Sequence, residues 1–137
     1  MLSGLPAIPQ GHLVLGVGID VVAVERFSES LARTPSLAAR LFAPAELVTP
    51  SGLLRRAVSL AGRFAVKEAV AKALGVPRGM EWHDCTVISD ESGRPLLVTT
   101  GTVLRAASSI GVTDWRLSLS HDAGIAAAVV LALGVSS

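Results

Sequence analysis

The sequence predicts an α+β fold, a single domain in which an antiparallel sheet is packed with helices. Apolar, β-branched runs at residues 13–22 and 124–133 predict buried strands near the two ends of the chain. The segment 61–75 consists mostly of strong helix formers and predicts a central helix. Two shorter runs, 85–89 and 95–99, are separated by five residues and predict a hairpin. The order strand, helices, strands, helix, strands favours an antiparallel sheet.

The composition indicates a globular protein without broad affinity for nucleic acid. Hydrophobic residues make up 50% of the 137 residues and charged residues 17%, which excludes disorder. A net charge of +1 and the absence of Tyr leave little with which to bind many phosphates or to stack bases. The single Cys85 excludes an internal disulfide and a zinc–cysteine cluster, and it fits a reducing compartment. We therefore expect no nucleic-acid partner.

The ends of the chain predict a cytoplasmic protein. Residues 1–12 contain two prolines, two glycines and no hydrophobic periodicity, and they predict a flexible N-terminal arm before a single domain at 13–137. The first basic residue is Arg26, so the basic region of a signal peptide is missing. The apolar run at 124–135 falls short of the ~20 residues that span a bilayer. We expect no membrane association.

The first strand places three unusual residues on one side. Gly16, Gly18 and Asp20 alternate along it, so their positions face the same way. Two glycines there allow another part of the chain to approach the backbone closely. A carboxylate at the end of an apolar strand is costly to bury unless it has a cation or hydrogen-bond donors. Asp20 therefore either belongs to a polar site or caps the following helix, and the pattern leaves both interpretations open.

A helix at residues 23–33 ends near Pro35, and a second short helix follows it. Arg26, Arg33 and Arg40 are spaced by seven, so they share one face if the two helices stay roughly collinear. Such a basic ridge suits an acidic protein partner. Ordinary solvated arginines are the alternative. A turn-rich connection with one helical turn follows before the central helix.

The central helix places its charges on two stripes. Glu68 and Lys72 are one turn apart on the first stripe, and Arg63 and Lys67 share the second. The remaining apolar residues form the back that packs on the core. A front with one carboxylate among three cations suits a hard metal ion beside an anionic phosphate. The alternative is a solvated helix with a Glu–Lys pair that contributes a few tenths of a kcal/mol.

The C-terminal half predicts the rest of the sheet. A short helix at 101–110 follows the hairpin, and 115–120 alternates polar and apolar residues as a strand does. A turn at 122–124 leads into the last strand.

The usual catalytic motifs are missing, and one small group of side chains remains. The chain has no complete dinucleotide loop, no Walker sequence, no clustered histidines and no nucleophile elbow. What remains is Asp20, Glu68 and Lys72, with His121 at a strand end. Two carboxylates can hold Mg²⁺ and leave its other positions to phosphate oxygens, while Lys72 contacts a phosphate. Two alternatives stay open: an enzyme that acts on a free nucleotide with the same site, and a non-catalytic oligomeric binding module.

Several motifs in order carry a family resemblance. They are Gly16-Val17-Gly18-Ile19-Asp20-Val21-Val22 with Glu25-Arg26-Phe27, Ala61-Gly62-Arg63-Phe64-Ala65-Val66-Lys67-Glu68-Ala69 with Lys72-Ala73-Leu74-Gly75, Trp82-His83-Asp84, Gly93-Arg94-Pro95 and Leu117-Ser118-Leu119-Ser120-His121-Asp122. Together they resemble the holo-acyl-carrier-protein synthases, the small 4′-phosphopantetheinyl transferases of fatty-acid synthesis. The similarity runs from about residue 13 to residue 130, nearly the whole chain.

The resemblance implies a role for each candidate site residue. Asp20 and Glu68 would hold Mg²⁺ with the diphosphate of coenzyme A, and Lys72 would contact that diphosphate. Arg63 and His121 would bind the 3′-phosphorylated ADP end of coenzyme A. Glu68, directly or through a metal-bound water, would accept the proton of the attacking serine.

The resemblance also implies partners and assembly. The acceptor would be apo-acyl carrier protein, and the products would be the holo-carrier protein and adenosine 3′,5′-bisphosphate. The ridge of Arg26, Arg33 and Arg40 would dock the acidic recognition helix of the carrier protein. The family further implies a homotrimer with active sites between neighbouring subunits.

Overall fold

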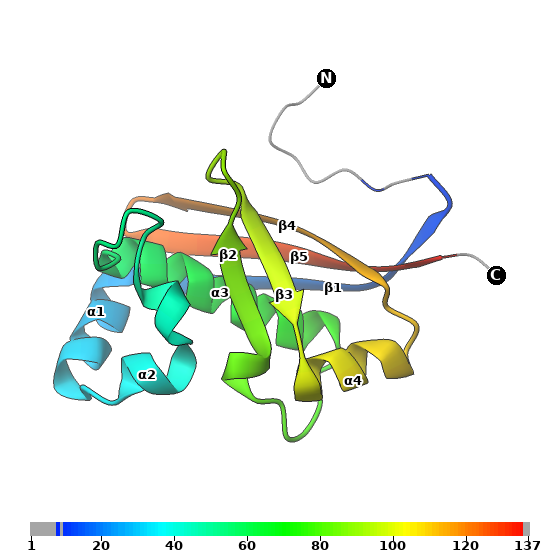
Figure 1. Ribbon diagram of the computed structural model, residues 1–137, viewed down its shortest axis with the longest axis horizontal. Coiled ribbons are helices and arrows are strands. Elements are labelled where there is room, and N and C mark those ends of the chain that lie inside the picture. Colours follow the sequence, from blue (N-terminus) through cyan, green and yellow to red (C-terminus); the bar gives the residue numbers. More distant parts are fainter. Residues whose placement is uncertain (1–7, 9, 136–137) are drawn as a thin grey trace.

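The computed structural model describes residue 8 and residues 10–135, and within them it confirms the α+β fold with an antiparallel sheet (Figure 1). The elements in chain order are β1 (His12–Ala23), α1 (Val24–Arg33), α2 (Leu37–Leu41), the 3₁₀ turn η1 (Pro44–Leu47), α3 (Ala57–Ala73), the 3₁₀ turn η2 (Trp82–Asp84), β2 (Cys85–Ser89), β3 (Pro95–Thr99), α4 (Gly101–Ser109), β4 (Asp114–Asp122) and β5 (Ile125–Val135). Most of the predicted N-terminal arm at 1–12 lies outside the described residues, and its last residue already belongs to β1.

Five strands form two antiparallel sheets within the described residues. The larger sheet has the order β1-β5-β4, and the hairpin β2-β3 forms the smaller one. In the larger sheet Gly18 pairs with Val130 and Asp20 pairs with Ala128. Helix α3 packs on β1 and β5 on one side and also contacts β2 of the hairpin, so it is the central element of the fold. It begins at Ala57, four residues before the predicted start.

Two glycines of β1 let α3 lie directly on the strand. A Cβ atom built on Gly16 would lie 2.0 Å from the carbonyl oxygen of Ala73, and one built on Gly18 would lie 1.8 Å from that of Ala69. Real Cβ atoms do not approach a backbone oxygen so closely, so any larger residue would push α3 away. The prediction of a close approach at these glycines is confirmed, and the approaching part of the chain is α3.

The other face of β1 is exposed, so the prediction of a buried strand is wrong for the single chain. Val17, Ile19 and Val21 are 57%, 62% and 58% exposed. They alternate with the glycines and therefore point to the face of the sheet opposite α3. The apolar run predicts a buried strand, but a run of apolar residues does not show whether the same chain or another one buries each face of the strand. We call Val17, Ile19 and Val21 the β1 strip.

Helix α3 is buried on nearly all sides, which corrects the predicted second charged stripe. Lys67 is only 1% exposed and Arg63 only 6%. The reason lies in η1, which packs over this side of α3 and brings Glu46, itself 1% exposed, into an ion pair of 2.8 Å with Lys67. Lys67 therefore does not contribute to a charged front.

Helices α1 and α2 are separated by a turn that breaks their predicted alignment. The amide of Leu37 donates to the carbonyl of Thr34 across this turn, which contains Pro35. Figure 1 shows α2 running at an angle to α1. The condition for a continuous ridge is therefore not met, although Arg26, Arg33 and Arg40 are all exposed. Among the described helices, none is long and apolar enough to cross a bilayer.

Candidate active site

The two predicted carboxylates come together at one groove. Asp20 from β1 and Glu68 from α3 both line a groove of about 430 Å³ between β1, α1 and α3. Phe27 and Phe64, whose rings stack at a centroid distance of 5.2 Å, lie along the same groove. Arg26 lies at its α1 side. The close contact between α3 and the glycines of β1 is what places Glu68 beside Asp20.

The charges of this groove interact strongly. Burial, and then the charge of Asp20, raise the pKa of Glu68, while Lys72 opposes the rise. Lys72 donates to Asp20 Oδ1 at 2.9 Å and to the carbonyl of Ile19 at 3.0 Å. Asp20 does not cap α1, because the residue at that cap is Ala23 and no side chain bonds there. The helix-cap interpretation of Asp20 is therefore excluded.

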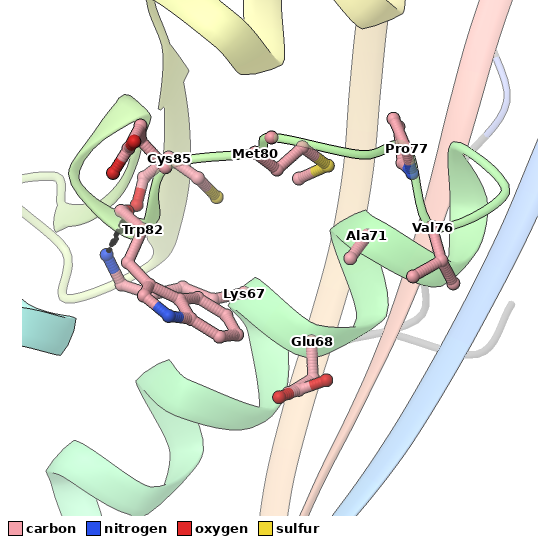
Figure 2. A pocket seen from close by; sticks show the side chains of 10 residues that line it. Lys67, Glu68, Ala71, Val76, Pro77, Met80, Trp82 and Cys85 are labelled. Atoms are coloured by element: carbon pink, nitrogen blue, oxygen red, sulfur yellow. Dashed lines mark hydrogen bonds between the residues drawn. The ribbon is translucent and has the colours of Figure 1, made fainter.

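A second hollow adjoins Glu68 on its other side. It has a volume of about 290 Å³ and is largely apolar. Figure 2 shows Glu68 at its edge, with Val76, Pro77, Met80 and Trp82 around it. We call this the apolar hollow, and the residues 80–82 and Cys85 its wall. Glu68 thus lies at the boundary between the groove and the apolar hollow.

A third feature is a cluster of two guanidinium groups near the start of α3. Arg55 and Arg63 both donate to the hydroxyl of Ser59, at 3.2 and 3.5 Å, and Arg63 also donates to Ser89 at 2.9 Å. Burial, and then the nearby charge of Arg55, lower the pKa of Arg63 to about 10. The Nε atoms of both arginines are buried without a hydrogen-bond partner among the described residues. Two cations held together in this way favour an anion between or beside them.

Arg55 was missed in the sequence, although a signal for it exists. Arg55, Ser59 and Arg63 are spaced by four, the spacing of neighbours on one helix face. Because the predicted helix began at residue 61, Ser59 fell outside it; in the structure Ser59 lies in α3 and Arg55 lies just before its start. Ser89 could not be found in this way, because only the folded chain brings β2 next to α3.

The remaining predicted residues do not converge on the groove within one chain. Arg63 precedes Glu68 by five residues, which separates them by about 140° around α3. His121 lies exposed near the end of β4, opposite Ala126 of β5. Arg33 and Arg40 lie on the exposed surfaces of α1 and α2. The chain therefore assembles Asp20, Glu68, Lys72 and Arg26 in one place and holds Arg63 and His121 elsewhere.

The donor set of the groove fits a hard divalent cation with an open coordination sphere. Among the described residues no group of three or more His, Cys, Asp or Glu side chains is placed to hold a metal. Two carboxylates alone leave most positions of Mg²⁺ to water and phosphate oxygens, as this ion prefers. The repulsion that contributes to the raised pKa of Glu68 is the interaction that a cation between the two carboxylates would relieve.

Proteins similar to this chain in sequence and fold include several holo-[acyl-carrier-protein] synthases. Residues 16–130 match the profile of the 4′-phosphopantetheinyl transferase superfamily. The holo-[acyl-carrier-protein] synthase of Salinispora arenicola is 59% identical over 120 residues, which cover 88% of this chain and 98% of the relative. That of Streptomyces coelicolor is 57% identical over 121 residues, covering 88% and 98%. The Helicobacter pylori holo-[acyl-carrier-protein] synthase solved with coenzyme A superposes with a TM-score of 0.72 at 31% identity, covering 88% and 99%.

Two substitutions should move the pKa of Glu68 in opposite directions. Asp20→Asn removes a negative neighbour and should lower the pKa of Glu68 toward its ordinary value. Lys72→Met removes the positive neighbour and should raise it further. NMR titration of the Glu68 carboxyl carbon measures this pKa in both variants. As the pH falls, Glu68 should become protonated at a lower pH in Asp20→Asn and at a higher pH in Lys72→Met than in the wild type. Equal pKa values in the wild type and both variants would show that the three side chains do not interact.

Proposed function

The chain belongs to the 4′-phosphopantetheinyl transferase superfamily, and we propose that it joins its two substrates at Glu68. It is a transferase that moves the 4′-phosphopantetheine arm of coenzyme A to a serine of apo-acyl carrier protein. The products are holo-acyl carrier protein and adenosine 3′,5′-bisphosphate, and the pathway served is fatty-acid biosynthesis. The observation that carries this proposal is the convergence of Asp20, Glu68 and Lys72 between the groove and the apolar hollow.

The groove and the apolar hollow suit two of the groups around the reacting phosphorus, the incoming serine and the pantetheine arm that stays bonded to it. The serine oxygen attacks the phosphorus next to the pantetheine arm, and the bond to the adenosine bisphosphate breaks on the opposite side. The groove bordered by Arg26 is open to a protein partner, whereas the apolar hollow suits the uncharged pantetheine arm. Glu68 lies between them and is placed to accept the serine proton.

Asp20 and Glu68 are the residues that would hold Mg²⁺. Bound there, the ion would offset negative charge on the phosphate oxygens. Lys72 is 47% exposed, so its ammonium can leave Asp20 and contact a phosphate oxygen of coenzyme A. The proposed catalytic residues are therefore Glu68, Asp20 and Lys72.

We assign the 3′-phosphorylated ADP end of coenzyme A to the guanidinium cluster. Arg63 and Arg55 offer two neighbouring cations, which suits a dianionic phosphate. His121 is proposed as a further contact at this end. Arg63 and Glu68 face different sides of α3. One coenzyme A molecule can therefore contact the guanidinium cluster of one copy of the chain and Glu68 of a neighbouring copy.

A homotrimer supplies such neighbours, and the β1 strip supports it. Val17, Ile19 and Val21 form a row of exposed apolar side chains on the face of the sheet opposite α3. Burying such a row against another copy removes apolar surface from water, at about 25 cal/mol per Å². The proposed assembly places the active sites between neighbouring subunits.

The carrier protein is proposed to dock on α1. Arg26 lies on the groove itself and Arg33 is exposed at the end of the same helix, so an acidic helix can contact both while its serine reaches Glu68. Arg40 lies beyond the turn on α2 and would contact the partner from a second direction.

We keep the cytoplasm as the proposed location, which the buried free thiol of Cys85 supports.

Replacing the proposed proton acceptor should abolish transfer. Glu68→Gln keeps the size of the side chain but removes its charge, so we expect at least a 100-fold loss of rate with an unchanged melting temperature. Asp20→Ala should behave alike. Mass spectrometry of apo-acyl carrier protein after incubation with coenzyme A and Mg²⁺ measures the gain of one phosphopantetheine arm. Full activity of either variant would contradict the site, and consumption of coenzyme A without carrier protein would favour a hydrolase.

Reversing a charge on α1 should affect only the carrier protein. Arg33→Glu repels an acidic helix, so KM for carrier protein should rise about tenfold or more while KM for coenzyme A stays constant. Arg105→Glu, an equally exposed arginine on α4, serves as the control and should change neither value. An equal effect of Arg33→Glu on both KM values would contradict docking on α1.

A charge in the β1 strip should prevent assembly. We expect Ile19→Asp to shift the sedimentation coefficient from that of a trimer to that of a monomer, because an aspartate would have to be buried unpaired between subunits. Leu104→Asp on α4, which likewise places an aspartate at an exposed aliphatic position, is the control and should stay trimeric. A wild-type chain that sediments as a monomer would contradict the assembly.

A further inference from the structure

The buried ion pair of Glu46 and Lys67 connects the helix that carries Glu68 to the wall of the apolar hollow. The ammonium of Lys67 donates to Glu46 Oε1 at 2.8 Å, to the carbonyl of Trp82 at 3.0 Å and to the carbonyl of Cys85 at 2.5 Å. These three acceptors use all three donors of the ammonium. Figure 2 shows Lys67 reaching toward the wall while the neighbouring Glu68 points away from it.

Glu46 completes the connection from the other side. Its Oε1 also accepts from the amide of Ala43 at 2.9 Å, and its Oε2 accepts from the amide of Val87 at 2.9 Å. The pair therefore joins η1, α3 and β2 through hydrogen bonds. The other hydrogen bonds to this segment come from elsewhere, with Thr102 of α4 accepting from the amide of Glu81 at 2.9 Å. From α3 itself, Lys67 hydrogen-bonds to the wall, and the ring of Phe64 packs on that of Trp82 at a centroid distance of 5.5 Å.

A fully buried ion pair is a poor device for stability alone. Removing two charges from water costs several kcal/mol each, and apolar residues of similar volume are often as stable. What such a pair can provide is a fixed geometry, because a shift of either partner breaks several bonds at once.

We infer that Lys67 and Glu46 are a positioning pair that sets the distance between α3 and the wall of the apolar hollow, and with it the affinity for coenzyme A. The inference rests on the proposed function, since it assigns the pantetheine arm to this hollow. Lys67 lines the hollow, but its ammonium is engaged by Glu46 and the two carbonyls and is assigned no contact with substrate. The pair acts through the carbonyls of Trp82 and Cys85, which hold Met80 and the Trp82 ring at the hollow.

The test compares Glu46→Gln with the double variant Glu46→Gln/Lys67→Met. The single variant removes one charge but leaves Lys67 bonded to both carbonyls, whereas the double variant removes those bonds and leaves no charge unpaired. The single variant should therefore be the less stable of the two. We nevertheless expect KM for coenzyme A near the wild-type value in the single variant and raised about tenfold in the double variant. In both, kcat and KM for carrier protein should stay within about twofold.

Two further measurements separate positioning from general stability. Amide hydrogen exchange at residues 80–85, measured without substrate, should accelerate in the double variant and not in Val112→Ala, which removes buried volume beyond α4. Inhibition by adenosine 3′,5′-bisphosphate, which lacks the pantetheine arm, should be unchanged. Lys67→Arg is a second variant that keeps a cation beside Glu46 but cannot match the three acceptors, and it should reproduce the raised KM.

The inference is overturned if KM for coenzyme A follows stability, so that Glu46→Gln raises it as much as the double variant does. It is also overturned if both substrates are affected equally, or if exchange at the wall is unchanged. A wild-type chain that transfers no arm would instead remove the proposed function, while the exchange measurement would still show whether the pair holds the wall.

Discussion

The contact between α3 and the glycines of β1 is the constraint on which the site depends. Because Gly16 and Gly18 have no Cβ atoms, the backbone carbonyls of Ala73 and Ala69 lie against the strand. The next residue on that side of β1 is Asp20, which is therefore delivered to the last turns of α3, where Lys72 and Glu68 lie. The close packing of α3 on β1 is therefore what brings the carboxylates of Asp20 and Glu68 together.

Two lysines of α3 differ in burial and therefore in what they can bind. Lys67 and Lys72 are five residues apart, yet one is fully buried against Glu46 and the other is half exposed beside Asp20. All three N–H donors of Lys67 are bonded to groups of the protein, so Lys67 holds parts of the fold together. Lys72 keeps access to solvent and can exchange its partner for a phosphate. Glu68 lies between these two situations, and its partial burial, together with Asp20, raises its pKa.

Much of the fold was predictable because its signals are local. The alternation around Gly16, Gly18 and Asp20, the helix formers after Ala57 and the hairpin at Cys85–Thr99 each depend on neighbouring residues, and the structure agrees with all of them apart from element boundaries. The burial of Lys67 was not predictable, since its partner Glu46 lies 21 positions earlier in the chain. For the same reason Ser89, 26 positions from Arg63, was missed as a member of the guanidinium cluster.

The exposed β1 strip has a consequence for the edge of its sheet. β1 is an edge strand among the described residues, so its outer apolar row lies next to backbone groups that pair with no further strand there. An edge of this kind is a template for adding further strands from other chains. A subunit interface over the β1 strip would therefore also shield this edge from pairing with other chains.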